Sequence, residues 1–359
     1  MIAIVHCGDL KYCPYMKRYI ERLEQLKIDY KVYFWNRANE NLQLTEKYVS
    51  FNSFSNLSKS KVFKLWDFFK FRSWLIKRMK SDKPEKIIVL STMTGIVLSS
   101  FLLKNSIEYI FDIRDYSYEH VKFFYRIEKK VIEKSRFTTI SSKGFKQFLP
   151  EHRYVIAHNF NRNDVVENAK FTKQSGKLSF VWNGVVRYFE FQKQYLMALK
   201  NDARFEIIYY GDGPELNLYK KFCQEENIQN VIFAGAYNNK DKYQLLKNAS
   251  ILNNCYGFVE NSWKQNKVKY AVSNRFYDGA VYHIPQIVEP TGFKKEWTRN
   301  TQIGESFLPN DNFADKVYNW YMSINPEVFD RHCDEVLQDV MQEDDEFISM
   351  IDSFIKEKV

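Results

Sequence analysis

The stretch IIYYGDGPELNLYKKF, residues 207–222, decides the fold of this chain, because an apolar run stops at a Gly-Asp-Gly-Pro turn and resumes at helical spacing. The run predicts a buried strand, and the spacing predicts a helix with one apolar face. In the turn, we expect Gly211 to end the strand, Gly213 to take a positive φ and Pro214 to begin the helix. A strand that passes through a tight turn into a helix is typical of parallel α/β sheets.

A dinucleotide fingerprint, Gly-x-Gly-x-x-Gly, is the first functional interpretation that this turn invites. Gly211 and Gly213 fit its first two glycines, but Leu216 stands at the third. No acidic residue follows at a convincing strand end about 20 residues further on, as the fingerprint requires. The sequence therefore argues against a nicotinamide-dependent enzyme. The amino end of the following helix still presents backbone N–H groups, which favour a nearby anion.

The same alternation of apolar strands and amphipathic helices runs through both halves of the chain. A length of 359 residues, 45% of them hydrophobic, suits two domains with sizeable cores. We therefore expect an α/β fold of two Rossmann-like domains that face each other across a cleft, with ligands at the carboxyl ends of the strands. The predicted parts are an N-terminal domain (1–160), a linker poor in large apolar residues (161–177), a C-terminal domain (178–335) and a C-terminal helix that can pack back on the N-terminal domain (336–359).

Charge and cysteine usage narrow the class of protein. The net charge of +9 and the pI near 9.0 predict an acidic partner, such as a nucleic acid, an anionic lipid or a phosphorylated substrate. The five cysteines, at 7, 13, 223, 255 and 333, show no paired spacing. This argues against a disulfide framework or a zinc site and favours a reducing cytosol.

Two apolar segments could be mistaken for a signal peptide or a membrane span, but the sequence predicts neither. The opening MIAIVHCGD is too short for the apolar part of a signal peptide and suits a buried first strand. Residues 87–103 are uncharged and approach the ~18 residues of a membrane span, but their centre is Ser, Thr and Gly. We expect this segment to form a buried strand, a turn and a buried helix.

Four segments carry a family resemblance when they are taken in their order along the chain. They are FVWNGVVRYFEFQKQYLMAL, FEIIYYGDGPELNLYKKF, NVIFAGAYNNKDKYQLLKNASILNNCY and VSNRFYDGAVYHIPQIV. In this order they resemble the C-terminal domain of B-type-fold glycosyltransferases, from the bacterial clan of capsule, O-antigen and exopolysaccharide enzymes. In the N-terminal half, FDIRDYSYEH is similar to the Asp-x-Arg-Asp segment of these enzymes, and VIAHNF is similar to their strand before the linker. The resemblance covers most of the chain and implies sugar transfer from a nucleoside diphosphate sugar.

The resemblance implies a donor site on the C-terminal domain. Arg187 and Lys193 match the positions where the family has cations on the donor diphosphate, and such charge stabilises the leaving group. Asp278 matches the acid that binds the nucleotide ribose, and Arg275, three residues before it, shares its helical face. Each of the first two cations is equally compatible with a solvated surface charge.

The sequence departs from the family pattern at two positions of this donor site. Retaining enzymes carry a Glu, seven residues and a second Glu, but Tyr270 occupies the first position, and His283 replaces the usual Gly. Whether the reaction retains or inverts the anomeric configuration therefore stays open. Glu260 is a nearby acid that could contact the sugar. By the same resemblance, Gly211 and Gly213 lie on the donor side and bring their backbone close to the nucleotide.

The N-terminal half supplies candidates for the acceptor side. Asp115 matches the Asp of the Asp-x-Arg-Asp segment, with Asp112 and Arg114 beside it at the end of a predicted strand. An aspartate that faces the acceptor could act as general base if the enzyme inverts, and would orient the acceptor if it retains. His120 is close in sequence and could take the proton instead. Helix capping or core hydrogen bonding would explain any one of them, but three charged groups at the end of a buried strand favour a site.

No Asp-x-Asp pair occurs anywhere in the chain. A-type glycosyltransferases need that pair to hold a divalent cation on the diphosphate. We therefore expect a metal-independent site without a cofactor, in which Arg, Lys and backbone dipoles bind the diphosphate of a UDP-sugar or a GDP-sugar.

Residues 59–80, KSKVFKLWDFFKFRSWLIKRMK, combine eight Lys or Arg with six aromatic rings and one Asp. Helical spacing predicts a core face made of Leu65, Phe69, Arg72, Ile76 and Met79. The aromatic residues left among cations on the other faces are Phe63, Phe71 and Trp74. Such a helix is typical of an interfacial membrane element or a surface for anionic ligands, although an ordinary surface helix has the same pattern. No nucleic-acid recognition fold is visible, so nucleic acid is not the expected partner.

Together these observations predict a cytoplasmic enzyme that is peripheral on the inner face of the cell membrane. Its expected reaction moves a sugar from a nucleotide sugar to a growing cell-surface glycan, carried on a polyprenyl diphosphate lipid. The alternative is a non-catalytic B-type-fold scaffold, or a basic α/β protein that binds an anionic partner.

Overall fold

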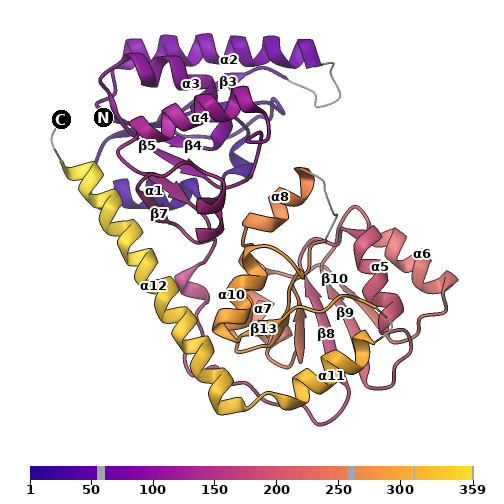
Figure 1. Ribbon diagram of the computed structural model, residues 1–359. Coiled ribbons are helices and arrows are strands. Elements are labelled where there is room, and N and C mark those ends of the chain that lie inside the picture. The colour runs from indigo at the N-terminus through magenta and orange to yellow at the C-terminus, as the bar shows by residue number, and fades with distance from the viewer. Residues whose placement is uncertain (55–60, 258–262, 311, 358–359) are drawn as a thin grey trace. The chain divides into compact units, whose positions relative to one another are not determined.

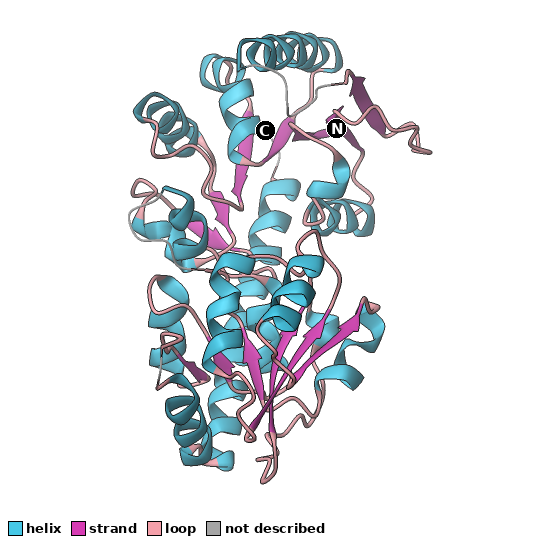
Figure 2. Cartoon of the chain, turned by 90° about the vertical axis from the view of Figure 1, so that its right-hand side faces the viewer, coloured by secondary structure: helices cyan, strands magenta, loops and turns pink. Residues whose placement is uncertain are grey.

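The computed structural model of the protein describes residues 1–54, 61–257, 263–310 and 312–357. The chain divides into two compact units: unit 1, Met1–His158 with Glu343–Val359, and unit 2, Asn159–Gln342. Each unit is built around one parallel sheet (Figure 1). Figure 2 shows helices on both faces of the sheets, so the predicted fold class of two Rossmann-like α/β domains is confirmed.

Unit 1 has a seven-stranded sheet in the order β3-β2-β1-β4-β5-β6-β7. Its strands are β1 Ile2–His6, β2 Tyr30–Asn36, β3 Tyr48–Asn52, β4 Lys86–Leu90, β5 Glu108–Ile113, β6 Thr138–Ile140 and β7 Tyr154–Ile156. Its helices include α1 Met16–Gln25, α2 Lys61–Asp82, α3 Thr92–Lys104 and α4 Lys122–Lys134. The strand order reverses between β1 and β4, which are neighbours.

Unit 2 has a six-stranded sheet in the order β10-β9-β8-β11-β12-β13. Its strands are β8 Leu178–Asn183, β9 Phe205–Tyr210, β10 Val231–Gly235, β11 Ile251–Asn253, β12 Gln286–Ile287 and β13 Gly304–Glu305. Its helices include α5 Phe189–Ala198, α6 Leu216–Glu225, α7 Lys242–Leu246, α8 Trp263–Tyr270, α9 Asn274–Val281, α10 Phe293–Thr301 and α11 Phe313–Ser323. Here the strand order reverses between β8 and β11.

The inner strands β1 and β4 of the first sheet are mostly apolar, because helices cover both faces of a parallel sheet. All five residues of β1, IAIVH, are buried, and so are all five of β4, KIIVL. At the edge of the second sheet, no residue of β10 is fully buried. Burial therefore follows the position of each strand in its sheet.

The last helix, α12, runs without interruption from Pro326 to Lys356 (yellow in Figure 1). It begins ten residues before the terminal helix that the sequence predicted at 336–359. Its final turns belong to unit 1, where Phe347, Ile351 and Phe354 pack in the core beside residues of β1 and α1. The first unit therefore contains residues from both ends of the chain.

Residues 87–103 form the predicted strand, turn and helix, which the structure divides between β4 and α3. The turn is made by Ser91, whose φ is 81° and whose hydroxyl accepts a hydrogen bond from the Thr94 amide at the start of α3. Among the described residues, no helix is both long enough and apolar enough to cross a bilayer.

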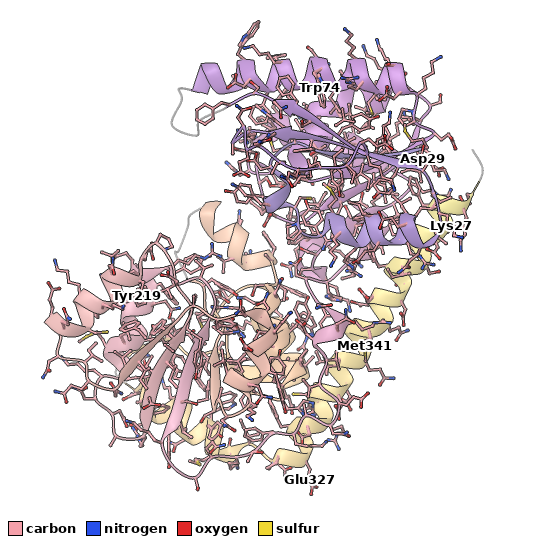
Figure 3. The ribbon with its side chains drawn as sticks, turned by 180° about the vertical axis from the view of Figure 1, so that it is seen from behind. Lys27, Asp29, Trp74, Tyr219, Glu327 and Met341 are labelled. Carbon is pink, nitrogen blue, oxygen red and sulfur yellow. The ribbon has the colours of Figure 1, made fainter. Side chains whose placement is uncertain are left out.

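The predicted core face of α2 is wrong at its first two positions, although Met79 is buried as predicted. Leu65 and Phe69, which were expected in the core, are 56% and 57% exposed, whereas Phe71 is fully buried. The reason is an aromatic cluster on the neighbouring strands: Phe71 stacks on Trp35 of β2, and Trp74 packs against Phe51 of β3. Trp74 is labelled on this helix in Figure 3. These ring contacts hold Phe71 and Trp74 against the sheet, while Leu65 and Phe69 are exposed. The side chain of Phe63 lies outside the described residues.

The Gly-Asp-Gly-Pro turn has the predicted strand and helix, but the roles of its residues differ from the prediction. Gly211 has the positive φ, 140°, and Gly213 does not. Gly213 is needed for space, because a Cβ there would lie 2.6 Å from the amide nitrogen of Val186. Pro214 does not begin the helix, since α6 starts at Leu216. The turn thus packs backbone against backbone on the loop that follows β8.

A buried carboxyl in unit 1 makes stability depend on pH. Glu128 on α4 is 1% exposed and accepts a hydrogen bond from the hydroxyl of Thr92 at 3.2 Å. Burial, reinforced by the carboxylate of Glu119, raises the pKa of Glu128 well above its ordinary value. The folded state therefore favours the neutral carboxyl of Glu128. The free energy of unfolding falls as the pH rises from the ordinary pKa of a glutamate to the raised pKa.

We expect Glu128→Gln to raise the melting temperature at pH 8 and to leave it nearly unchanged at pH 4, because the amide keeps the shape without the charge. Circular dichroism melts across this range measure the difference. Glu133→Gln, on the exposed side of the same helix, is the control and should shift the melting temperature little at either pH. Equal shifts at both pH values in Glu128→Gln would contradict the explanation.

Candidate functional site

The carboxyl ends of β8 and β11 form the point where the strand order of unit 2 reverses. Open α/β sheets bind ligands at such a switch point, because the loops after the two strands turn to opposite faces and leave a crevice. Arg275, near the start of α9, lies at this point. Its guanidinium donates to the carbonyl oxygens of Asn183, the last residue of β8, at 2.9 Å and of Asn253, the last residue of β11, at 3.3 Å.

Aromatic rings hold the same guanidinium in place. It lies over the ring of Trp182, 3.7 Å from the centroid, and near the ring of Tyr256 at 4.7 Å. Its Nε donates to the Tyr256 hydroxyl at 3.0 Å. A cation between aromatic faces is stabilised by their quadrupoles. The side chain is half-buried, so a fixed positive charge borders this edge of the sheet.

Asp278 lies one turn further along α9 and is 4% exposed. Its Oδ2 accepts from the side-chain amide of Asn183 at 2.8 Å, and its Oδ1 accepts from Nζ of Lys242, on α7, at 2.8 Å. Burial raises the pKa of Asp278, while Lys242 opposes the rise. The structure therefore brings the two predicted residues of α9, Arg275 and Asp278, to adjoining positions around Asn183.

A second buried ion pair follows β12. Nζ of Lys294 lies 2.6 Å from Oε2 of Glu289, and both side chains are 2% exposed. The ammonium also donates to the Asn254 carbonyl at 2.9 Å, and the Tyr256 amide donates to the Glu289 carboxylate at 2.6 Å. This pair ties the segments after β11 and β12 together beside Arg275.

The loop after β8 carries Arg187, which is exposed and packs over the ring of Tyr188 at 4.8 Å. A side chain of α6 holds its backbone: the hydroxyl of Tyr219 (labelled in Figure 3) donates to the Arg187 carbonyl at 2.7 Å. The carboxylate of Glu215, in the residues after the Gly-Asp-Gly-Pro turn, accepts from the Phe189 amide at 2.8 Å. An internal carboxylate therefore occupies the first amide of α5.

Lys193 points to a different surface. It pairs with Glu190 at 2.6 Å on the same helix and lines a shallow cavity with Phe222, Glu226 and Pro309. The residues that line this cavity differ from those that contact Arg275 and Asp278. Glu260, the remaining candidate of the donor side, lies outside the described residues.

In unit 1, the structure separates the three candidates of the acceptor side. Asp112 is fully buried at the end of β5 and accepts hydrogen bonds from Tyr19 at 2.5 Å and from Arg114 at 2.6 and 2.9 Å. The Arg114 guanidinium also donates to the Ala157 carbonyl at 2.6 Å. This bidentate pair links β5 to the end of β7, which gives Asp112 and Arg114 a structural use.

Asp115 and His120 are both exposed, in the loop between β5 and α4. The His120 ring stacks on Tyr116 with 6.2 Å between centroids and lies near the ring of Tyr118 at 6.4 Å. Phe123, at the start of α4, is 68% exposed. Two titratable groups and an aromatic surface thus occur together in the loop after β5.

Sequence reasoning missed His6, the last residue of β1, at the switch point of the first sheet. It is 6% exposed, and its Nδ1 lies 3.4 Å from the Leu90 carbonyl at the end of β4. Burial lowers the pKa of His6 to about 4, so the imidazole is neutral at physiological pH. The polar residues after the apolar run, His-Cys-Gly-Asp, were the available signal.

Lys242, Glu289 and Lys294 were also missed on the donor side. Nothing in the sequence marks them, because each acquires its role from a partner that folding brings close. Within the described residues, no group of three or more His, Cys, Asp or Glu is arranged to hold a metal ion.

No protein-family model matches this chain, and neither does any curated protein. Solved structures do match it. The apo lipopolysaccharide outer core galactosyltransferase WaaB is 16% identical, with a TM-score of 0.63 over 93% of this chain and 94% of that chain. A glycosyltransferase from Rickettsia africae is 11% identical, with a TM-score of 0.64 over 99% of each chain. Anabaena Alr3699/HepE, solved in complex with UDP, is 11% identical, with a TM-score of 0.61 over 98% of this chain and 99% of that chain.

At these identities the likeness concerns the fold. The chain has the B-type glycosyltransferase fold of two Rossmann-like domains, and it is structurally similar to glycosyltransferases along nearly its whole length.

Proposed function

We propose that this protein is a glycosyltransferase that moves a sugar from a nucleoside diphosphate sugar to a growing cell-surface glycan carried on a polyprenyl diphosphate lipid. The donor would bind at the carboxyl edge of the sheet in unit 2. Its diphosphate would face Arg275 and Arg187, and its ribose would face Asp278. The backbone near Gly213 is also proposed to contact the donor, and Lys193, which lines a separate cavity, is proposed to contribute positive charge to the same domain.

The observation that carries this proposal is the position of Arg275. Of the five N–H groups on a guanidinium, three have partners within the described residues, which leaves two that can face a phosphate. Transfer of the sugar develops negative charge on the leaving diphosphate, and a fixed cation stabilises that charge without reorganising. The fold of the neighbouring solved structures, one of which holds UDP, supports the same conclusion.

Metal independence belongs to the proposal and rests on the missing Asp-x-Asp pair. Activity should therefore survive EDTA.

His283, which stands where the family has Gly, adopts a φ of 52°, the region that glycine favours, and pairs with Asp330 at 2.6 Å. For the acceptor side, Asp115 and His120 remain proposed as base or orienting groups, and Asp112 is proposed to hold Arg114.

Two measurements test the proposal. Calorimetric titration with UDP, GDP and ADP should reveal binding of at least one nucleotide, and Arg187→Ala should weaken it. Product NMR with a panel of nucleotide sugars and lipid-linked acceptors then identifies the sugar and the anomeric outcome together. If none of the three nucleotides binds at millimolar concentration, the donor site is refuted.

The alternative function is a scaffold of the same fold that binds an anionic partner without catalysis. The observation in its favour is that Asp278 already has partners in Lys242 and Asn183. The scaffold would be favoured if the protein binds a nucleotide but neither transfers the sugar nor slowly hydrolyses the donor, for every donor in the panel.

We also propose that α2 attaches the protein to the inner face of the membrane. Leu65, Trp66 and Phe69 are 56%, 61% and 57% exposed on one part of the helix. The exposed cations Lys70 and Lys77 follow on the same helix. Aromatic side chains beside basic ones suit the boundary between acyl chains and anionic headgroups.

We expect the double variant Trp66→Ser with Phe69→Ser to lower the affinity for phosphatidylglycerol vesicles at least about tenfold, because two large apolar side chains no longer leave water. Flotation with these vesicles measures the bound fraction. Leu218→Ser on α6, where the leucine is 50% exposed, is the matched control and should bind as the parent does. Unchanged flotation of the double variant would sink the membrane assignment.

A further inference from the structure

One ammonium group in unit 2 lies between two carboxylates. Nζ of Lys242 is 2.8 Å from Oδ1 of Asp278 and 3.4 Å from Oδ2 of Asp164. The Lys242 side chain is 12% exposed, that of Asp278 is 5% exposed, and that of Asp164 is 40% exposed. The ammonium is therefore closer to the more deeply buried of its two partners.

The hydrogen bonds of Asp278 use only part of its accepting capacity. Oδ1 accepts from Lys242 and Oδ2 accepts from the Asn183 amide, both at 2.8 Å. An ionised carboxylate offers about four acceptor positions, so about one remains on each oxygen. Two adjacent hydroxyl groups can donate to these two positions at once. A protonated carboxyl would bind the pair less well, because the oxygen that carries the hydrogen is a weak acceptor.

We propose that Lys242 is a positioning residue of the nucleotide site: it keeps Asp278 an ionised acceptor for the vicinal diol of a ribose, so that the site prefers ribonucleotides to 2′-deoxyribonucleotides. This inference rests on the donor site proposed above. Lys242 acts through Asp278 and need not touch the nucleotide.

Among the groups around Asp278, Lys242 favours the ionised carboxylate most strongly and so opposes the effect of burial. The groups that face Asp278 are Lys242 from α7, Asn183 from β8, Arg275 from α9 and Tyr237 after β10. The groups that face Lys242 itself are Asp278, Asp164 and the ring of Tyr282. Burial alone would lower the pKa of Lys242, but Asp278, followed by Tyr282 and Asp164, raises it overall, so the ammonium stays charged.

Removal of that charge has a predictable sign. Burial raises the pKa of Asp278, and Lys242 is the strongest influence that lowers it. Without the ammonium, Asp278 should take up its proton at a higher pH than in the parent. Recognition of the diol should then weaken as the pH falls and recover as the pH rises.

The experiment is calorimetric titration of the whole protein between pH 5 and pH 8 with UDP and GDP, and with the 2′-deoxy form of each nucleotide that binds. For the parent we expect a preference of about tenfold for the ribonucleotide, the worth of one hydrogen bond to a charged group. In Lys242→Met this preference should be lost at a higher pH than in the parent and should return as the pH rises further. Lys242→Arg should retain it, because the guanidinium also carries a permanent charge.

Two further variants separate this role from a merely structural one. Asp164→Asn removes the other partner of Lys242 and should keep the parent's preference and pH profile. Asp278→Asn should abolish the preference at every pH, because an amide cannot accept on both of its atoms. This variant also tests the inference if Lys242→Met does not fold.

The outcomes are distinguishable. If the parent binds neither UDP nor GDP, the donor site itself is refuted, and this inference falls with it. If the parent binds a nucleotide but Lys242→Met has the same preference and pH profile, the role of Lys242 is refuted while the donor site stands. A full preference for the ribonucleotide in Asp278→Asn would refute the role of the carboxylate.

Discussion

Gly211→Ala is expected to destabilise unit 2 by about 4 kcal/mol or more, the range reserved for substitutions that force the backbone to move. Gly211 has a φ of 140°, which side chains rarely adopt, and a Cβ there would overlap the carbonyl group of Gly184, with the carbonyl carbon at 2.8 Å. Neither atom is at the end of a flexible side chain, so neither can turn aside. Urea denaturation followed by circular dichroism measures the loss.

Two other glycines of the same unit provide graded controls. Gly235 has a φ of 81° but open space around a Cβ, so Gly235→Ala should cost only about 1 kcal/mol of backbone strain. Gly176 has neither restriction, so Gly176→Ala should be neutral or slightly stabilising. A Gly211→Ala protein as stable as Gly235→Ala would show that the turn can relax, contrary to the close packing seen here.

Arg275→Met is expected to lower the free energy of unfolding by about 3 kcal/mol and the affinity for UDP or GDP by about 100-fold. The variant removes hydrogen bonds to the carbonyls of Asn183 and Asn253 and leaves both oxygens without that donor at a half-buried edge. It also removes the cation from the face of Trp182, which contributes about 1 kcal/mol. Thermal unfolding and nucleotide titration measure the two effects separately.

Arg299→Met, an exposed arginine on α10, controls for the loss of a positive charge and should change stability by no more than about 0.5 kcal/mol. Arg275→Lys should be intermediate, because a single ammonium cannot reach both strand ends. A variant Arg275→Met that binds nucleotide as the parent does would assign Arg275 to structure alone.

The switch point explains why the donor-side residues occur together. The ends of β8 and β11 are hydrogen-bonded neighbours, yet they are 70 residues apart in the chain, at Asn183 and Asn253. Arg275 on α9 bridges them, and Asp278 reaches back to Asn183. The charged residues Arg275 and Asp278 therefore lie together because the spatial order of the strands places β8 beside β11.

Local pattern was sufficient to predict most elements and the fold class. A strand buried on both faces needs a nearly continuous apolar run, so IAIVH, which ends in His6, and KIIVL, which begins with Lys86, can be recognised from the local sequence. The strand β3, YVSFN, has no such signal, because it lies at the sheet edge, where no position is fully buried and no continuous apolar run is needed. The sequence also placed Arg275 and Asp278 in one site, because residues three positions apart on a helix lie on the same face.

Tertiary structure alone decided which face of α2 is buried and which charges are paired. Helical spacing is the same for every rotation of a helix that is rich in aromatic residues on all sides, so only contact with Trp35 and Phe51 selects one. The partners Lys242 and Asp278 are 36 residues apart, and no local pattern joins them. By itself, the sequence determined the strands, the helices and the glycine turn, because these depend on neighbours along the chain. The rotation of α2, the ion pairs and the fork of Arg275 across two strand ends depend on neighbours in space, which exist only once the sheet has formed.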